Sequence, residues 1–133
     1  MNVLRRFTIT VVILVAGFTP AAWGQTEKRL PNLTVLSIGV SHHKAPGKDL
    51  RYAAKDARDL AAALKLHDGK LFGKVQTRTL TDAEATRKNI EEALDWLAKQ
   101  VRPDDYVIVF VAGHGNIDAL GHYNFVPHDF EPG

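Results

Sequence analysis

The fold is decided by a seven-residue apolar run that stops at glycine, histidine and glycine: it has the sequence YVIVFVA from Tyr106 to Ala112 and continues as Gly113-His114-Gly115. The run is too short to span a membrane and is rich in β-branched and aromatic residues, which predicts a strand buried on both faces, as in a parallel sheet covered by helices. Ligands bind at the carboxyl ends of strands in open α/β sheets, so His114 is expected at the end of the sheet that bears a site. The flanking glycines permit close approach by another group and favour an exposed imidazole. His114 is therefore a candidate catalytic residue, weighed against the commoner case of a histidine that only belongs to a loop.

Composition bounds what the chain can be. It has 133 residues, of which 45% are hydrophobic and 24% charged, and this profile indicates one ordinary globular domain. The formal net charge of +2 comes from Arg5 and Arg6, because without them fifteen Lys and Arg residues balance fifteen Asp and Glu residues. No basic cluster remains, so nucleic-acid binding is not expected. The chain has no cysteine, which excludes a disulfide, a cysteine-ligated zinc site or a cysteine nucleophile within these residues.

Residues 1–24 have the three parts of a secretory signal peptide. A basic start precedes an apolar core at residues 7–18, and small residues at Ala22 and Gly24 predict cleavage just after position 24. The core is shorter than the roughly 20 residues that a membrane-spanning helix needs, although an uncleaved membrane anchor is the alternative interpretation. We therefore expect export to a bacterial periplasm or beyond, with no membrane attachment after cleavage.

After the leader, a flexible arm is expected at the polar residues 25–32, and a single domain at 33–133. Two further stretches with β-branched residues predict strands at 33–40 and 75–80. Polar residues alternate with β-branched ones along the second of these, which is typical of an edge strand. A short strand or hairpin arm is predicted within 122–129, beside the glycine-histidine-glycine loop, where polar and apolar residues alternate up to a proline.

Two amphipathic helices are predicted between the strands, at residues 49–66 and 84–101, because their apolar residues recur at helical spacing. Asp49 is the expected cap of the first helix, and a capping box of Thr81 and Glu84 is expected to begin the second. Strands that alternate with helices form right-handed crossovers and a mostly parallel sheet. We predict a three-stranded parallel core in the strand order second, first, third, with the two helices on opposite faces, an arrangement that right-handed crossovers allow but do not require.

Histidines outside the central run offer only weak site patterns. His42 and His43 are adjacent and point in different directions, with no further ligand at suitable spacing, so a solvated loop is favoured over a metal site. A three-histidine site of His114, His122 and His128 meets no spacing rule, and His122 and His128 are expected at the surface. The sequence also lacks a phosphate-binding loop, a dinucleotide-binding glycine motif and a serine-hydrolase elbow. No metal site and no nucleotide cofactor are therefore expected.

Four ordered segments resemble the large-subunit half of caspase-like cysteine peptidases, and most closely the bacterial metacaspase type. They are VLSIGV at residues 35–40, LRYAAKDA at 50–57, LTDAEAT at 80–86 and VFVAGHG at 109–115, followed by YNFVPHD at 123–129. The resemblance covers about residues 33–129, which is nearly all of the expected mature chain. It implies an α/β fold of the caspase type, a three-layer sandwich in which helices cover both faces of a mostly parallel sheet.

The same resemblance implies roles for three residues. His114 matches the catalytic histidine, which handles the proton given to the leaving amine. Gly115 matches the glycine whose backbone amide helps to hold the developing oxyanion. Asp56 matches the aspartate that lines the primary specificity pocket and selects arginine or lysine before the scissile bond by charge-assisted hydrogen bonding. A peptide or protein substrate is implied, and a calcium requirement is left open by the resemblance.

The chain departs from the family at its carboxyl end. By resemblance, the nucleophilic cysteine belongs on the next strand, whereas this sequence stops at Gly133 and has no cysteine. We therefore expect a partial caspase-like peptidase domain that is truncated before the strand bearing the nucleophile and is inactive alone. Its expected partners are a missing carboxyl-terminal half and, through an unpaired strand edge, further copies of itself. Two alternatives stand beside this interpretation: a non-catalytic caspase-like binding module, and a small α/β hydrolase or metal enzyme unrelated to caspases.

Overall fold

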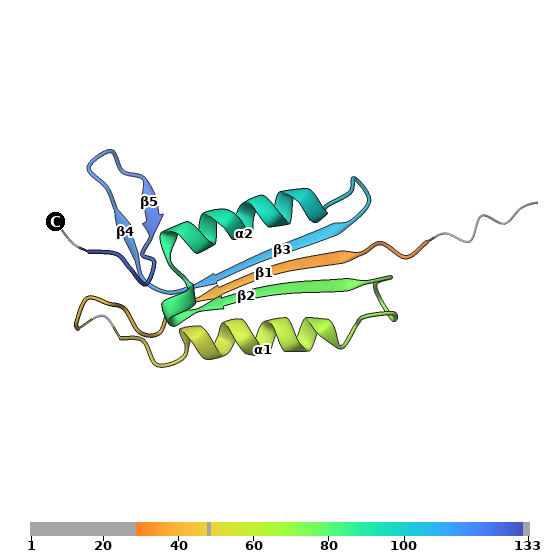
Figure 1. Ribbon diagram of the computed structural model, residues 1–133, viewed down its shortest axis with the longest axis horizontal. Helices are drawn as coiled ribbons and strands as arrows, with labels where there is room; N and C mark the ends of the chain where they lie inside the picture. Colours follow the sequence, from red (N-terminus) through yellow and green to blue (C-terminus); the bar gives the residue numbers. More distant parts are fainter. Residues whose placement is uncertain (1–28, 48, 132–133) are drawn as a thin grey trace, which may run out of the picture.

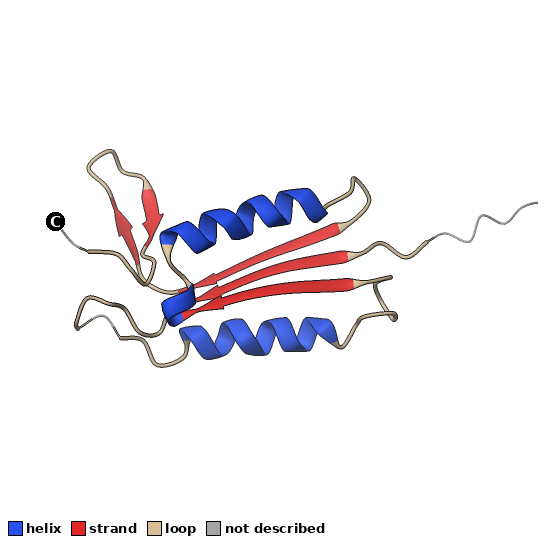
Figure 2. Cartoon of the chain, in the orientation of Figure 1, coloured by secondary structure: helices blue, strands red, loops and turns tan. Residues whose placement is uncertain are grey.

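The computed structural model describes residues 29–47 and 49–131, and within them a three-stranded sheet lies between two helices (Figure 1; Figure 2). The predicted signal peptide at 1–24 and the first part of the predicted arm lie outside the described residues. A small two-stranded hairpin follows the sheet at its carboxyl end. Neither helix of the described part is long and apolar enough to cross a membrane.

The sheet is parallel and has the strand order β2-β1-β3, which confirms the predicted order. Its strands are β1 (Leu33–Gly39), β2 (Val75–Thr81) and β3 (Tyr106–Ala112), connected by helices α1 (Ala53–Lys65) and α2 (Arg87–Gln100). In register, Leu36 of β1 lies between Arg78 of β2 and Val109 of β3. All of β1 is buried, so the central strand carries the core.

The two helices cover opposite faces of the sheet, as predicted. Successive side chains of β1 point to opposite sides, so each helix packs on a different set of them. Helix α1 lies on the face of Ser37, whose hydroxyl donates a 2.7 Å hydrogen bond to the carbonyl oxygen of Ala57. Helix α2 lies on the face of Leu36, which packs in one buried cluster with Leu97. A Cβ at Gly39 would lie 2.2 Å from a carbonyl oxygen of α1, so glycine is what lets that helix approach the strand.

Helix α1 begins later than predicted, and Asp49 does not cap it, because its carboxylate lies 3.3 Å from Nδ1 of His42 instead. The residue before the helix is Tyr52, whose side chain makes no capping hydrogen bond. The cap comes from a residue distant in sequence, since the hydroxyl of Ser41 accepts a 2.9 Å hydrogen bond from the N–H of Ala54. The first turn of α1 is thereby tied to the loop that follows β1.

The predicted capping box at the start of the second helix is wrong. Residues Asp82–Glu84 form a single 3₁₀ turn (η1), and Thr81 makes no side-chain cap. Helix α2 begins after Thr86, whose hydroxyl accepts a 3.2 Å hydrogen bond from the N–H of Asn89. The reason lies in Asp82, whose φ of 47° cannot continue a helix and whose carboxylate bonds to the loop after β1.

Strand β3 is not buried on both faces, which corrects the prediction. Its side chains on the α2 side of the sheet are well exposed, at 42% for Val107, 48% for Val109 and 47% for Val111. On the α1 side, Ile108 is half-buried and packs against the core cluster of that face. The physical reason is that β3 forms an edge of the sheet and α2 packs on β1 and β2.

Strands β4 (Gly115–Ile117) and β5 (Tyr123–Phe125) form an antiparallel hairpin, which confirms the short strand predicted within 122–129. Asp118 holds the turn, because its Oδ1 accepts 2.9 Å hydrogen bonds from two backbone N–H groups of that turn. The backbone hydrogen bond from His122 is the main cause that lowers the pKa of the Asp118 carboxyl. A charged aspartate therefore shapes the hairpin beside the candidate site.

Candidate active site

His114 follows β3 and is held by backbone hydrogen bonds on two sides. The N–H of Val40 donates a 2.9 Å hydrogen bond to the carbonyl oxygen of Ala112, which carries the pairing of β1 and β3 up to the histidine. The carbonyl oxygen of His114 accepts a 2.9 Å hydrogen bond from the N–H of Val126, just after β5. The residue is half-buried, whereas the glycines around it were expected to favour an exposed imidazole. Sheet and hairpin together fix the backbone of the candidate catalytic residue.

The glycines on either side of His114 have a packing reason that the sequence pattern did not indicate. A Cβ at Gly113 would lie 2.6 Å from Cε2 of Phe125, and a Cβ at Gly115 would lie 2.0 Å from the hydroxyl oxygen of Tyr123. Both rings belong to β5, so the hairpin packs directly onto the two glycines. Any larger residue at either position would push the hairpin away from the histidine.

The N–H of Gly115 points away from β5. Gly115 pairs with Phe125 in the hairpin. The hydrogen bond from Val126 N–H to His114 carbonyl oxygen identifies this pair as a non-hydrogen-bonded one, in which the N–H groups face outward from the partner strand. The amide next to His114 is therefore directed toward the side of β4 that the hairpin does not occupy.

His43 is a buried neighbour of His114 that sequence reasoning missed. Its side chain belongs to the loop after β1, only 8% of the residue is exposed, and its ring centroid lies 5.3 Å from that of His114 with an angle of 47° between the ring planes. The prediction of a solvated loop is thus wrong for His43, although it holds for the exposed His42. No local pattern marks the difference, because it depends on which of the two rings faces the end of β3.

Two further residues hold the loop that carries His43. Oδ1 of Asp82 accepts hydrogen bonds of 2.8 Å from the backbone N–H groups of both Ser41 and His42. Nδ1 of His128 lies 2.7 Å from the carbonyl oxygen of His42, and since a carbonyl only accepts, this nitrogen donates. The loop is therefore bound both to the end of β2 and to the segment that follows the hairpin.

Asp56 lies in the first turn of α1 with its side chain exposed. Its neighbour Ala57 packs against Gly39, the last residue of β1, where a Cβ would lie 2.7 Å from Cβ of Ala57. Because Gly39 ends β1, this contact places Asp56 at the same end of the sheet as His114, and Figure 1 shows that α1 begins at this end. Within residues 29–47 and 49–131, no ion pair involves its carboxylate.

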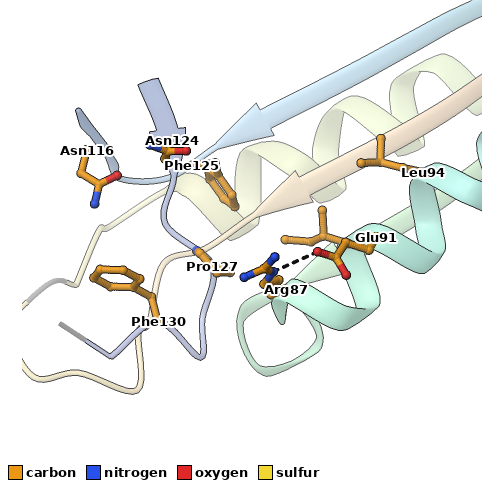
Figure 3. Close-up of a pocket in the computed structure, with 9 residues that line it drawn as sticks. Arg87, Glu91, Leu94, Asn116, Asn124, Phe125, Pro127 and Phe130 are labelled. Atoms are coloured by element: carbon orange, nitrogen blue, oxygen red, sulfur yellow. Dashed lines mark hydrogen bonds and ion pairs between the residues drawn. The ribbon is translucent and has the colours of Figure 1, made fainter. Parts of the chain in front are cut away.

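A cavity of about 720 Å³ lies between the first half of α2 and the hairpin (Figure 3). Its apolar lining consists of Ile90, Leu94, Phe125, Pro127 and Phe130. Arg87 and Glu91 border it with a 2.9 Å ion pair (Figure 3). The cavity adjoins the histidine loop, because the ring of Phe125 also packs against Gly113. It lies on the α2 side of the sheet, so it is not the pocket expected around Asp56 on α1.

His122 and His128 make structural contacts. His122 is exposed and its Nδ1 lies 3.3 Å from the carboxylate of Asp118, whereas His128 is half-buried rather than at the surface. Across the part of the chain that the structure describes, no three His, Asp or Glu side chains are grouped so that they could hold a metal ion. The three-histidine arrangement that was weighed from the sequence is thus not assembled there.

Comparison with known proteins agrees with this architecture. A model of the caspase domain matches residues 34–130 of the chain. Metacaspase-1 of Scheffersomyces stipitis is 30% identical to the chain over 90 residues. That match covers 63% of this chain and 22% of Metacaspase-1, so the chain spans little more than a fifth of the length of this curated relative.

These matches overturn the alternative of a small hydrolase or metal enzyme unrelated to caspases. The matched region begins at the second residue of β1 and runs past the hairpin, so it includes nearly all of the parallel sheet, both helices and His114. The helix-sheet-helix layering of these elements is consistent with a caspase-like α/β fold. The chain belongs to the caspase domain family.

Proposed function

We propose that this chain is the histidine-bearing half of an exported cysteine endopeptidase that cleaves peptide bonds after arginine or lysine. The observation that carries the proposal is the placement of His114 in a caspase-family domain. It follows β3 at the carboxyl end of a parallel sheet, half-buried and held by the hairpin. This is the end of an α/β sheet at which ligands bind.

The proposed reaction needs a thiolate, which the 133 residues do not contain. A cysteine from a polypeptide segment outside them attacks the carbonyl carbon of the scissile bond, and the carbonyl oxygen becomes an oxyanion. The imidazolium of His114 gives its proton to the leaving amine as the carbon–nitrogen bond breaks. Water then attacks the thioester carbonyl carbon and gives a proton to His114, and the carbon–sulfur bond breaks to release the carboxylic acid and the thiolate, which restores the thiolate and imidazolium pair.

Gly115 is proposed as a donor to the oxyanion. Its N–H faces away from β5 and follows His114 directly, so proton transfer and charge stabilisation come from adjacent residues. One such donor is typically worth about 3 kcal/mol of the activation barrier. The close packing of Tyr123 on Gly115 supports this assignment, because it holds the amide in one orientation.

Asp56 is proposed as the residue that selects arginine or lysine. Its carboxylate is exposed in the first turn of α1, at the same end of the sheet as His114. A guanidinium or ammonium group would form charge-assisted hydrogen bonds with it. In Asp56→Asn the preference for basic residues over neutral ones should therefore fall, while the chemistry at His114 is retained.

The test is to join the chain beyond residue 133 to a cysteine-bearing carboxyl-terminal half of a metacaspase and to measure hydrolysis of fluorogenic peptides. We expect cleavage after arginine, none after aspartate, and a loss of at least about 1,000-fold in His114→Ala. His122→Ala is the matched control, since it removes an exposed imidazole from the same region and should leave the rate unchanged. Activity that persists in His114→Ala would refute the proposal.

Export is the second part of the proposal and has its own test. Residues 1–24 carry the pattern of a cleaved signal peptide, so mass spectrometry of the secreted protein should find an amino terminus at Gln25. Membrane-bound material that retains Met1 would instead support an uncleaved anchor.

A non-catalytic binding module is the second candidate, favoured by one observation: the chain contains no cysteine. In that case the chain alone should bind an arginine-containing peptide through Asp56 without cleaving it. Calorimetric titration with such a peptide, compared with Asp56→Asn, separates the two candidates. Tight binding by the chain together with an inactive cysteine-bearing fusion would favour the module.

A further inference from the structure

The imidazole of His43 is buried and the reaction proposed above does not use it. Only 8% of the residue is exposed, although a histidine is more often found at least partly in water. Its ring lies beside the ring of His114, with centroids 5.3 Å apart and the planes tilted by 47°. The buried ring thus forms part of the wall against which the candidate catalytic ring rests.

The side chain of His114 needs packing contacts from elsewhere in the fold, because the residues before and after it are glycines. Gly113 and Gly115 have no side chains, and the rings of Phe125 and Tyr123 occupy the space where their Cβ atoms would lie. A proton donor must also be held close to one geometry, since a displacement of about 1 Å can cost about 100-fold in rate. Side-chain support for His114 therefore has to come from another part of the fold.

The loop that carries His43 is anchored on both sides of that residue. Before it, the N–H groups of Ser41 and His42 donate to Oδ1 of Asp82 at 2.8 Å. After it, the N–H of Lys44 donates a 2.9 Å hydrogen bond to the carbonyl oxygen of His128. The ring of His43 is consequently attached to a backbone that has little freedom to withdraw from His114.

Asp82 adds an independent sign that this anchoring is specific. It has a φ of 47°, and it is the non-glycine residue with a positive φ in the described part of the chain. Such a conformation is uncommon for residues with side chains and concentrates where function requires a fixed geometry. Here the conformation places the carboxylate under the two N–H groups that precede His43.

We propose that His43 is a positioning residue for His114: its ring packs against the His114 imidazole and holds that side chain in one rotamer, on a loop fixed by Asp82. The proposal rests on the proposed catalytic role of His114 for its meaning in function. The contact itself is independent of that role and is measurable in the chain alone.

The first experiment is nuclear magnetic resonance of the histidine side chains in the full chain. We expect a nuclear Overhauser effect between the rings of His43 and His114 and an ordered His114 side chain. In His43→Ala the His114 ring should average over several rotamers, and in His43→Phe, which keeps a flat ring, it should stay ordered. His42→Ala is the matched control, since it removes an exposed imidazole from the same loop and should change nothing at His114.

Three results of this experiment would overturn the proposal. One is a His114 side chain that is equally ordered in folded His43→Ala and in the unsubstituted chain. The other two decide the matter even if His43→Ala fails to fold. They are the absence of the ring-to-ring nuclear Overhauser effect in the unsubstituted chain and a disordered His114 in folded His43→Phe.

The second experiment uses the cysteine-bearing fusion described above. His43→Ala should lower kcat by about 100-fold with KM little changed, and His43→Phe should recover most of that loss. A fusion that is inactive with an ordered His114 would refute the proposed function and leave the positioning contact standing. Full activity in His43→Ala would refute the positioning role alone.

Discussion

The two edge strands of the sheet flank the same central strand and yet differ in composition. β2 has the sequence VQTRTLT, in which polar residues recur, and β3 has the sequence YVIVFVA, which is apolar apart from one hydroxyl. Leu36 of β1 makes the contrast concrete, because it pairs in register with Arg78 on one side and Val109 on the other. The Arg78 guanidinium lies 5.9 Å from the ring centroid of Trp96 on α2, whereas Val109 is 48% exposed.

The sheet therefore has one edge, at β2, that discourages pairing with another strand, and one edge, at β3, that is open to it. Polar and charged side chains discourage pairing at an edge strand, whereas an apolar edge with free backbone groups invites another strand. β2 has the first character and β3 the second. Under the proposed function, a cysteine-bearing half would continue the sheet at the edge of β3.

The largest expected effect is a loss of unfolding free energy that is greater for the central strand β1 than for the edge strand β3. Leu36→Ala removes a fully buried side chain and should lower the free energy of unfolding by about 2–5 kcal/mol. Val109→Ala should cost less than about 1 kcal/mol, because half of that side chain is already exposed. Urea denaturation of both variants measures the two values. Equal losses of unfolding free energy in the two variants would mean that another chain covers β3 in solution.

The next effect concerns association through the open edge. We predict that the chain self-associates and that Val109→Arg, which gives β3 the side chain found at the matching position of β2, weakens the association at least about tenfold. A charge buried without a partner between two strands is costly, which is the physical reason. Sedimentation equilibrium measures the dissociation constant.

Arg78→Lys is the control for this prediction, because it keeps the charge on β2 and should leave association unchanged. A chain that remains monomeric at high concentration and unfolds cooperatively would remove the claim that β3 is open. Equal weakening by both variants would place the contact elsewhere.

A third prediction compares the starts of the two edge strands, each of which an aspartate anchors. Asp105 precedes β3 with a side chain only 2% exposed, and the backbone N–H of Asn32 donates a 2.9 Å hydrogen bond that holds the pKa of Asp105 below its ordinary value. Asp68 anchors β2 with a side chain 40% exposed. Hydrogen bonds from Lys65 first and then from Val75 N–H lower the pKa of Asp68.

A carboxyl with a lower pKa in the folded chain stabilises the fold above its unfolded pKa of about 3.9, and this contribution is lost as pH falls through the folded value. Asp105→Asn should therefore destabilise the chain at pH 7, more than Asp68→Asn does, and both differences should shrink below about pH 4. Denaturant titrations at pH 7, 5 and 3 measure this. A difference that stays constant across these pH values would contradict the electrostatic explanation.

The smallest expected change in unfolding free energy concerns β2, the edge that discourages pairing. Arg78→Ala removes the guanidinium that lies over Trp96 and should cost about 0.5–1 kcal/mol of unfolding free energy. Tryptophan fluorescence should change with it, since the ring loses its cover. Thr77→Ala is the control on the same strand, where an exposed side chain should contribute less. No difference between the two would mean that Arg78 is merely solvated.

Much of the layout could be predicted because it depends on local periodicity. β-Branched residues at 33–40 and 75–80 indicated strands, and apolar residues at helical spacing indicated the two helices. The handedness of the crossovers allowed the strand order and the opposite helix faces that the structure has, and the position of His114 directly after the apolar run placed it at the carboxyl end of β3. The burial of β3 was overestimated because an apolar composition shows that a strand can be buried on both faces, but does not show whether helices cover both. In this structure α1 covers one face of β3, and α2 packs on β1 and β2 instead.

What the sequence determined by itself is therefore the set of strands and helices, their faces and a histidine between two glycines. Three contacts could be seen only in the folded chain. The ring of His43 lies against that of His114, and the hydroxyl of Ser41 caps α1. At the end of β2 there is no capping box, and the carboxylate of Asp82 binds the N–H groups of Ser41 and His42. Periodicity acts between neighbours a few residues apart, so it is visible in the chain. Those three contacts join loops that are distant in sequence, and they exist only because parallel strands deliver their carboxyl ends to one place.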